Sequence, residues 1–106
     1  MAKGAYLGEF EHIVLLTVLR LGEDAYGAAI RAEIERLADR VPTIGAVHAT
    51  LERLERKGLV SSRIGEPTAE RGGKAKRHFK IERAGVAALK DARMTFERLH
   101  AGLSLR

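Results

Sequence analysis

The sequence predicts a mainly α-helical fold that contains one small β-hairpin. Apolar residues recur at steps of three and four over several stretches of the 106-residue chain, which is the spacing of amphipathic helices. One stretch, 76–81, instead alternates strictly between two faces, as a strand does, and it follows a glycine-rich turn. The length suits one domain with a modest core, and the absence of cysteine excludes disulfides and thiolate metal sites.

The first predicted helix covers residues 9–21 and ends at Gly22. Its apolar residues, which include Phe10 and Val14, occupy more than one stripe, so this helix needs cover on several sides. In so short a chain a second subunit is one possible cover. A central position in the core of a monomer is the alternative.

A second helix is expected at about residues 26–37, with Asp24 as its N-cap. Residues 40–42 are then extended, because the residue before a proline avoids the helical region. This break is short, and it leads directly into the next helix.

The third predicted helix covers residues 43–57, between the N-cap Thr43 and a C-terminal glycine, Gly58. One side is an apolar stripe that anchors the helix on the core, whereas the opposite side is nearly bare at its N-terminal end. Two helices with a short break between them, the second with a bare outer face, form a helix-turn-helix whose second helix meets DNA. The stripe consists of Ile44, Val47, Leu51 and Leu54, and the DNA-facing residues are Thr43, Gly45, Ala46, His48 and Ala49.

Residues 59–64 and 76–81 are expected to be strands joined by a loop with Pro67 and three glycines. A hairpin in this place is a wing, so the fold class is a winged helix-turn-helix. From Thr43 to Arg83 the chain carries ten basic and five acidic residues, and the remainder is neutral. This cluster favours a phosphate-facing surface, and a solvated basic face is the alternative. The cations expected to contact DNA are Arg53, Arg71, Lys74, Lys76 and Arg77.

The last predicted helix covers residues 82–103, and its apolar residues form a narrow seam of heptad type. Its length, roughly 30 Å, exceeds what a small winged helix needs for its own core. This favours dimerisation over packing within one subunit. We therefore expect a DNA-binding domain at 1–81, with its recognition helix at 43–57 and its wing at 60–81, and a dimerisation helix at 82–106. The expected dimer contacts are Phe10, Val14, Leu89, Ala92, Phe96, Leu99 and Leu103.

Four motifs occur in an order typical of one known family. They are Tyr26-Gly27 with Ile30, GAVHATLERLE at 45–55 continued by KGLV at 57–60, GKAKRHF at 73–79, and Ala84-Gly85. In these motifs, which cover most of the chain, the sequence resembles the PadR-type winged-helix transcriptional regulators, in the short form with one C-terminal helix. Ala46, His48 and Ala49 stand where that family usually has Thr, Tyr and Pro, so the operator is expected to differ from those of better-known relatives.

The resemblance implies a homodimeric repressor, and a dimer would read a pseudo-palindromic operator in double-stranded DNA. Some members of the family respond to small aromatic ligands. Tryptophan, which some of them use to stack a ligand between subunits, is absent here, so the existence and identity of an effector stay open. A winged-helix module that binds protein or RNA is the alternative function.

Nothing in the sequence indicates an enzyme, a cofactor or a metal. The four histidines, His12, His48, His78 and His100, lack metal-ligand spacing, and no serine has an evident base partner. No apolar run is long enough to cross a bilayer, and the first residues do not resemble a signal peptide. A cytoplasmic protein without a membrane partner is therefore expected.

Overall fold

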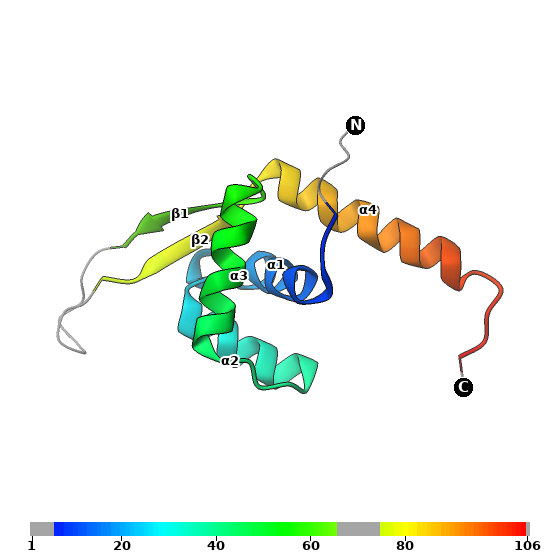
Figure 1. Cartoon of the computed structure of the whole chain (residues 1–106), viewed down its shortest axis with the longest axis horizontal. Coiled ribbons are helices and arrows are strands. Elements are labelled where there is room, and N and C mark those ends of the chain that lie inside the picture. The colour runs from blue at the N-terminus through cyan, green and yellow to red at the C-terminus, as the bar shows by residue number, and fades with distance from the viewer. Residues whose placement is uncertain (1–5, 66–74, 106) are drawn as a thin grey trace.

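The computed structural model describes residues 6–65 and 75–105, and Figure 1 shows their arrangement. A group of three helices lies at the centre, a two-stranded hairpin extends to one side, and the last helix extends to the other. This arrangement confirms the expected fold class, a winged helix-turn-helix. The elements are α1 (Glu9–Leu21), a short 3₁₀ turn (Gly22–Asp24), α2 (Gly27–Ala38), α3 (Ile44–Arg56), β1 (Val60–Ile64), β2 (Arg77–Ile81) and α4 (Arg83–His100).

Helix α1 is the centre of the core. It contacts α2, α3, α4 and β2, so much of the cover that its apolar surface requires comes from its own chain. Leu16 and Leu19 remain about half exposed on the side that these elements leave open. The buried core consists of Val14, Leu15, Val18, Ala25, Ile30, Ile34, Val47, Leu51, Leu54, Leu59, Val60, Phe79, Ala88 and Leu89.

The turn between α2 and α3 is held by polar contacts at both of its ends. Arg31 donates from Nε to the carbonyl oxygen of Pro42 at 2.8 Å, and Thr43 Oγ1 accepts a hydrogen bond from the Ala46 amide at 3.0 Å. The second contact is the predicted N-cap. Together they fix the direction in which α3 leaves the turn.

Two local expectations are wrong. Asp24 does not cap α2, because residues 22–24 form a separate 3₁₀ turn and Tyr26 occupies the N-cap position. Ile44 does not anchor α3, because the first turn of the helix extends beyond the core and leaves this side chain 44% exposed.

The hairpin is antiparallel, with Val60 opposite Ile81 and Ser62 opposite Phe79. It is also joined to the segment before α2, since the Phe79 amide donates to the carbonyl oxygen of Ala25 at 2.8 Å. The wing is therefore attached to the helix-turn-helix by backbone hydrogen bonds as well as by side-chain contacts.

Helix α4 begins in close contact with the hairpin and then leaves the core. A side chain at Gly85 would clash with the carbonyl oxygen of Leu59 and would lie 2.7 Å from Cγ1 of Ile81, so only glycine fits without a shift. Leu89 is the last buried residue of α4, and the far end of the helix projects from the body of the molecule (Figure 1). It ends at His100, three residues before the expected end, so Leu103 lies past the helix. Within residues 6–65 and 75–105 no helix has the length and apolar character needed to cross a membrane.

Candidate nucleic-acid interface

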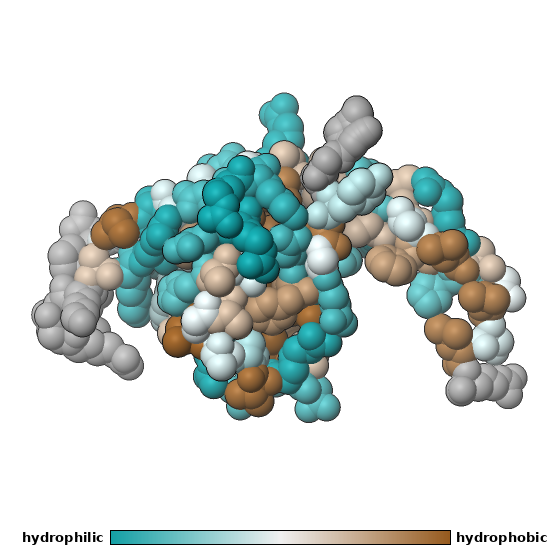
Figure 2. Space-filling model, in the orientation of Figure 1, coloured by the Kyte–Doolittle hydropathy of each residue, from teal (hydrophilic) through white to brown (hydrophobic). Residues whose placement is uncertain are grey.

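The N-terminal half of α3 presents an open surface, which we call the tip: Thr43, Ile44, Gly45, Ala46, His48 and Ala49. All six residues are exposed. A Cβ atom built on Gly45 would meet no atom within 4 Å. In Figure 2 pale and brown atoms cover the lower part of α3, where the tip lies, whereas teal atoms cover its upper part. The tip is therefore a bare and mainly apolar surface at the end of a charged helix.

His48 is the one long polar side chain of the tip, and α2 supports it. Gly27 at the start of α2 lies directly beneath the imidazole, because a Cβ there would be 2.7 Å from Cε1 of His48. The ring remains exposed and makes no hydrogen bond to any residue that the structure describes. It can donate to or accept from a base edge or a phosphate.

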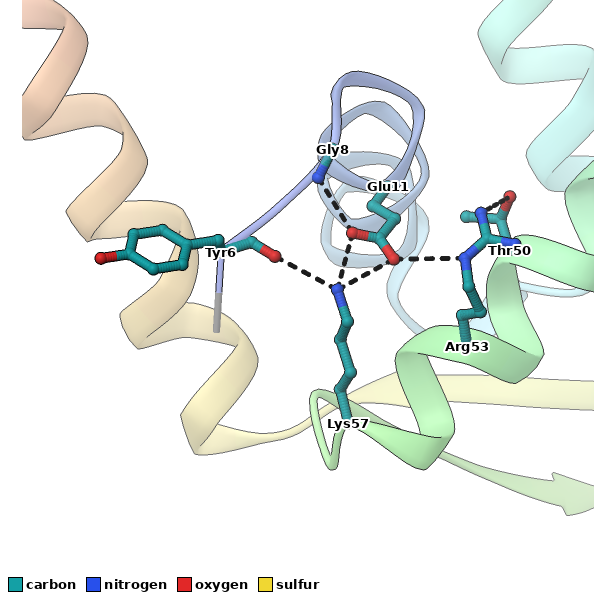
Figure 3. Close-up of polar contacts among 6 residues, drawn as sticks. All are labelled: Tyr6, Gly8, Glu11, Thr50, Arg53 and Lys57. Atoms are coloured by element: carbon teal, nitrogen blue, oxygen red, sulfur yellow. Dashed lines mark hydrogen bonds and ion pairs between the residues drawn. The ribbon is translucent and has the colours of Figure 1, made fainter. Parts of the chain in front are cut away.

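The C-terminal half of α3 is tied to α1 through Glu11 (Figure 3). The Glu11 carboxylate accepts hydrogen bonds from Lys57 Nζ at 2.8 and 3.0 Å and from Arg53 Nε at 3.3 Å. It also accepts the backbone amide of Gly8 at 2.9 Å, which is half of a capping box at the start of α1. Arg53 donates further to Thr50 Oγ1, and Lys57 to the carbonyl oxygen of Tyr6.

The electrostatics of this cluster, which we call the Glu11 cluster (Tyr6, Gly8, Glu11, Thr50, Arg53 and Lys57), favour an ionised carboxylate. Glu11 is only 7% exposed, and this burial by itself raises the pKa of its carboxyl group. The hydrogen bonds and charge of Lys57, the Gly8 amide and Arg53 outweigh the burial, so the pKa is lowered below the ordinary value of 4.5. Arg53 of α3 and its C-cap residue Lys57 are therefore held by one negative charge of α1.

Two of the wing cations within the described residues, Lys76 and Arg77, also have partners in the chain. Arg77 donates from Nη2 to Glu55 at 2.8 Å and from Nε to Ser62 Oγ at 3.0 Å, which links β2 to α3. Lys76 Nζ lies 4.2 Å from the centroid of the Tyr26 ring, as in a cation–π contact. Arg71 and Lys74 lie outside the described residues.

The expected dimer contacts divide into two groups. Val14 and Leu89 are 0% and 7% exposed and lie in the core of the subunit, so the structure corrects their assignment to its surface. Phe10 and Ala92 are half-buried. Phe96, Leu99 and Leu103 are 55%, 66% and 65% exposed, and they form an apolar surface where α4 projects beyond the core.

Sequence reasoning missed the carboxylates that hold the candidate cations, Glu11 and Glu55. The spacing from Gly8 to Glu11, from N-cap to third helical residue, was a signal for one contact of Glu11. Its partners Arg53 and Lys57 are 42 and 46 residues away in sequence, and no local pattern reveals them.

Two further features concern other kinds of site. A groove of about 440 Å³ lies between the end of α1 and the hairpin, lined by residues such as Leu19, Arg63 and Phe79. Among residues 6–65 and 75–105 no group of three or more His, Asp or Glu side chains is placed to hold a metal ion. The exposed tip of α3 and the cations beside it therefore remain the best candidate for a functional surface.

Comparison with known proteins concerns the fold and the family of the chain. Among solved structures the fold is similar to a PadR-like transcription factor from Bacteroides fragilis (TM-score 0.69, 20% identity, 86% of this chain and 82% of that one). It is also similar to a transcriptional regulator from Clostridium thermocellum (TM-score 0.69, 23% identity, 85% of this chain and 84% of that one). A third similar structure is RosR of H. salinarum (TM-score 0.71, 20% identity, 96% of this chain and 84% of that one). At these identities the likeness shows a common fold.

The sequence itself decides the family. No curated protein matches the chain. The model of the transcriptional regulator PadR-like family, however, matches residues 15–91, which include the helix-turn-helix, the hairpin and the first half of α4. The chain therefore belongs to the PadR-like family of transcriptional regulators.

Proposed function

We propose that this protein is a sequence-specific DNA-binding repressor that acts as a homodimer on chromosomal DNA in the cytoplasm. The observation that carries the proposal is the exposed tip of α3. It stands at the N-terminal end of the second helix of a helix-turn-helix, where such folds meet base edges, in a chain that belongs to a family of transcriptional regulators.

In this proposal the tip enters the major groove. Gly45, Ala46 and Ala49 allow the helix backbone to approach the bases closely, and His48 supplies a hydrogen-bonding group. Arg53 and the wing cations bind phosphates, which gives affinity and register, whereas the tip gives sequence preference. The positive charge of the segment from Thr43 to Arg83 suits this division.

The projecting part of α4 supports a dimer. Phe96, Leu99 and Leu103 lie beyond the reach of the subunit's own core, and Leu16 and Leu19 of α1 are about half exposed as well. Neighbouring exposed apolar side chains of this size are typical of an interaction surface. We propose that residues 82–106, which contain α4, form the dimerisation segment and residues 1–81 the DNA-binding domain. Two recognition helices would then contact half-sites about one DNA turn apart, roughly 34 Å, or a multiple of it.

A binding titration tests the DNA-binding part. Duplexes selected by the protein from a random library are compared with scrambled duplexes at several salt concentrations. We expect tighter binding to the selected duplexes and a steep fall in affinity with salt. The double variant Lys74→Glu and Lys76→Glu should lose binding to both. Equal affinity for scrambled DNA, or tighter binding to RNA, would instead support a winged-helix module without a specific operator.

Solution mass measurement tests the dimer. The wild-type protein should have twice the mass of the chain, and Leu99→Ser should shift it towards the monomer and weaken operator binding. Leu37→Ser, at an apolar residue of α2 that is similarly exposed, is the matched control and should remain dimeric. A monomeric wild-type protein at the concentrations that bind DNA would contradict the dimer.

A further inference from the structure

The Glu11 cluster uses its two cations in different ways. The ammonium group of Lys57 has three N–H donors. The structure gives it three acceptors, both Glu11 carboxylate oxygens at 2.8 and 3.0 Å and the Tyr6 carbonyl oxygen at 3.1 Å. The ammonium group of Lys57 is therefore engaged within the subunit while the cluster is intact.

Arg53 keeps donors that point to no other group of the described chain. It uses Nε for Glu11 and one hydrogen of Nη2 for Thr50, each at 3.3 Å, and its side chain is 46% exposed. Because the guanidinium group is planar and rigid, these two contacts fix its plane. The end formed by Nη1 and the second hydrogen of Nη2 stays available for an acceptor outside the subunit.

We propose, on the basis of the DNA binding proposed above, that Glu11 is a positioning residue for that interface. Its buried carboxylate holds Arg53 so that the free end of the guanidinium meets a DNA phosphate in a fixed direction. Lys57 is an internal anchor that keeps the carboxylate in place, and it does not contact DNA. A side chain ordered before binding loses less conformational entropy in the complex, so the orientation supports affinity for the correct register.

A simpler role for Glu11 predicts the opposite result. If the carboxylate only neutralised two nearby cations, its removal would free positive charge and would tighten binding to any DNA. If it positions Arg53, its removal weakens binding to the selected duplex, and it does so only while Arg53 is present. The sign of the change and its dependence on Arg53 separate the two roles.

The experiment is a double-mutant cycle with Glu11→Gln, Arg53→Gln and the double variant, each titrated with selected and scrambled duplexes at several salt concentrations. Glu11→Gln should weaken binding to the selected duplex roughly tenfold, the scale of one charge-assisted hydrogen bond. Arg53→Gln should weaken it similarly and should reduce the salt slope by about one. The double variant should bind no more weakly than Arg53→Gln alone.

Two matched variants complete the test. Glu9→Gln removes a carboxylate from the same helix, one whose only ion-pair partner among the described residues is Arg40 on the surface, and it should bind as the wild type does. Arg53→Lys tests the proposal if Glu11→Gln proves unfolded in a thermal melt. It keeps the charge and Glu11 but lacks the planar fork, so it should bind the selected duplex roughly tenfold more weakly.

The outcomes are distinguishable. Tighter binding by Glu11→Gln, additive effects in the cycle, or wild-type affinity of Arg53→Lys would overturn the positioning role and leave the proposed function in place. A wild-type chain that binds no duplex would overturn the proposed function and this inference with it.

Discussion

The two halves of α3 differ in the polar contacts that their outer side chains make with the rest of the chain. In the N-terminal half, the side chains of Ile44, Ala46, His48 and Ala49 make no hydrogen bond or ion pair within the described residues. In the C-terminal half, Arg53 and Lys57 are bonded to α1. Glu55 is bonded to the hairpin. One end of the helix is thus free to meet a partner, and the other end is fixed to the fold.

This difference suggests how a small domain can present a bare surface accurately. The tip has few side chains that could hold it in place by contacts with the rest of the fold. The ion pairs at the far end, together with the cap at Thr43, hold the whole helix as one rigid rod. We infer that the charged half fixes the position of α3 in the fold, and that the half with small residues lets a partner approach the helix closely.

The strongest way to break the comparison is to crowd the tip. Ala49→Glu adds a long negative side chain to the exposed face of α3. It should weaken DNA binding by roughly 100-fold or more, because it blocks close approach and repels phosphates. The free energy of unfolding should change by less than about 0.5 kcal/mol, as at other exposed helix positions.

The same substitution at Ala87, an exposed residue of α4, is the control for Ala49→Glu. It should leave DNA affinity near that of the wild type. An electrophoretic shift titration with the selected duplex measures the DNA affinities of both variants. Equal losses at the two positions would remove the special status of the tip.

The second prediction concerns the fixed half. Lys57→Met removes the cation with most contacts to Glu11 and should lower the free energy of unfolding by about 1–3 kcal/mol, measured by urea denaturation. The salt slope of DNA binding should not change, because the ammonium group is already occupied within the subunit. Arg56→Gln, at a neighbouring exposed cation that has no partner among the described residues, should change stability by less than about 0.5 kcal/mol. A reduced salt slope in Lys57→Met would place this residue on the DNA.

The third prediction is a dependence of stability on pH. The pKa of Glu11 in the folded protein is lowered below 4.5, so its stabilising contribution is present above pH 4.5 and is lost as the pH falls through the lower folded value. Urea denaturation from neutral pH down to about pH 3 should therefore show a smaller loss in Glu11→Gln than in the wild type.

Glu33 also titrates in this acid range, but it does not affect the comparison of the two proteins. The hydrogen bond from Arg36 lowers the pKa of its carboxyl group too, but this group is common to both proteins and cancels in their difference. Identical acid dependence in the wild type and in Glu11→Gln would show that the cluster does not contribute.

The smallest effects are expected from replacing the two glycines near the ends of α3 by alanine. Gly45→Ala fills open space at helical dihedral angles and should raise stability by up to about 1 kcal/mol, while it weakens DNA binding several-fold. Gly58→Ala meets no neighbour either, but φ is +78° there, so it should lower stability by about 1 kcal/mol. Thermal melts of both variants test the signs. Tighter DNA binding by Gly45→Ala would show that the bare surface is not needed for approach.

Local features of the sequence were sufficient to predict most of the fold. Helix α1 has the expected bounds because apolar periodicity and Gly22 define them, and Thr43 caps α3 because its hydroxyl is next to the amides that need an acceptor. The wrong N-cap at Asp24 has a local cause as well, since residues 22–24 form a 3₁₀ turn of their own.

The parts that sequence reasoning missed depend on contacts between distant segments. Periodicity placed Ile44 on the core stripe, but it does not show where the core ends. The same pattern placed Val14 on a subunit surface, although it is fully buried in a helix that contacts α2, α3, α4 and β2. No local pattern singles out Glu11, and only the fold brings the end of α3 to it.

The glycine at the base of α4 has a consequence for the geometry of the proposed dimer. Because Gly85 lies against the Leu59 carbonyl, the angle at which α4 leaves the hairpin is set by a contact that tolerates no added atom. Helix α4 has 18 residues, so it works as a lever. A tilt of about ten degrees at this elbow would displace its far end by roughly 4 Å, given the 1.5 Å rise per residue. In a dimer joined through α4, one bulkier residue at the elbow would re-space the two recognition helices without altering any group that contacts DNA.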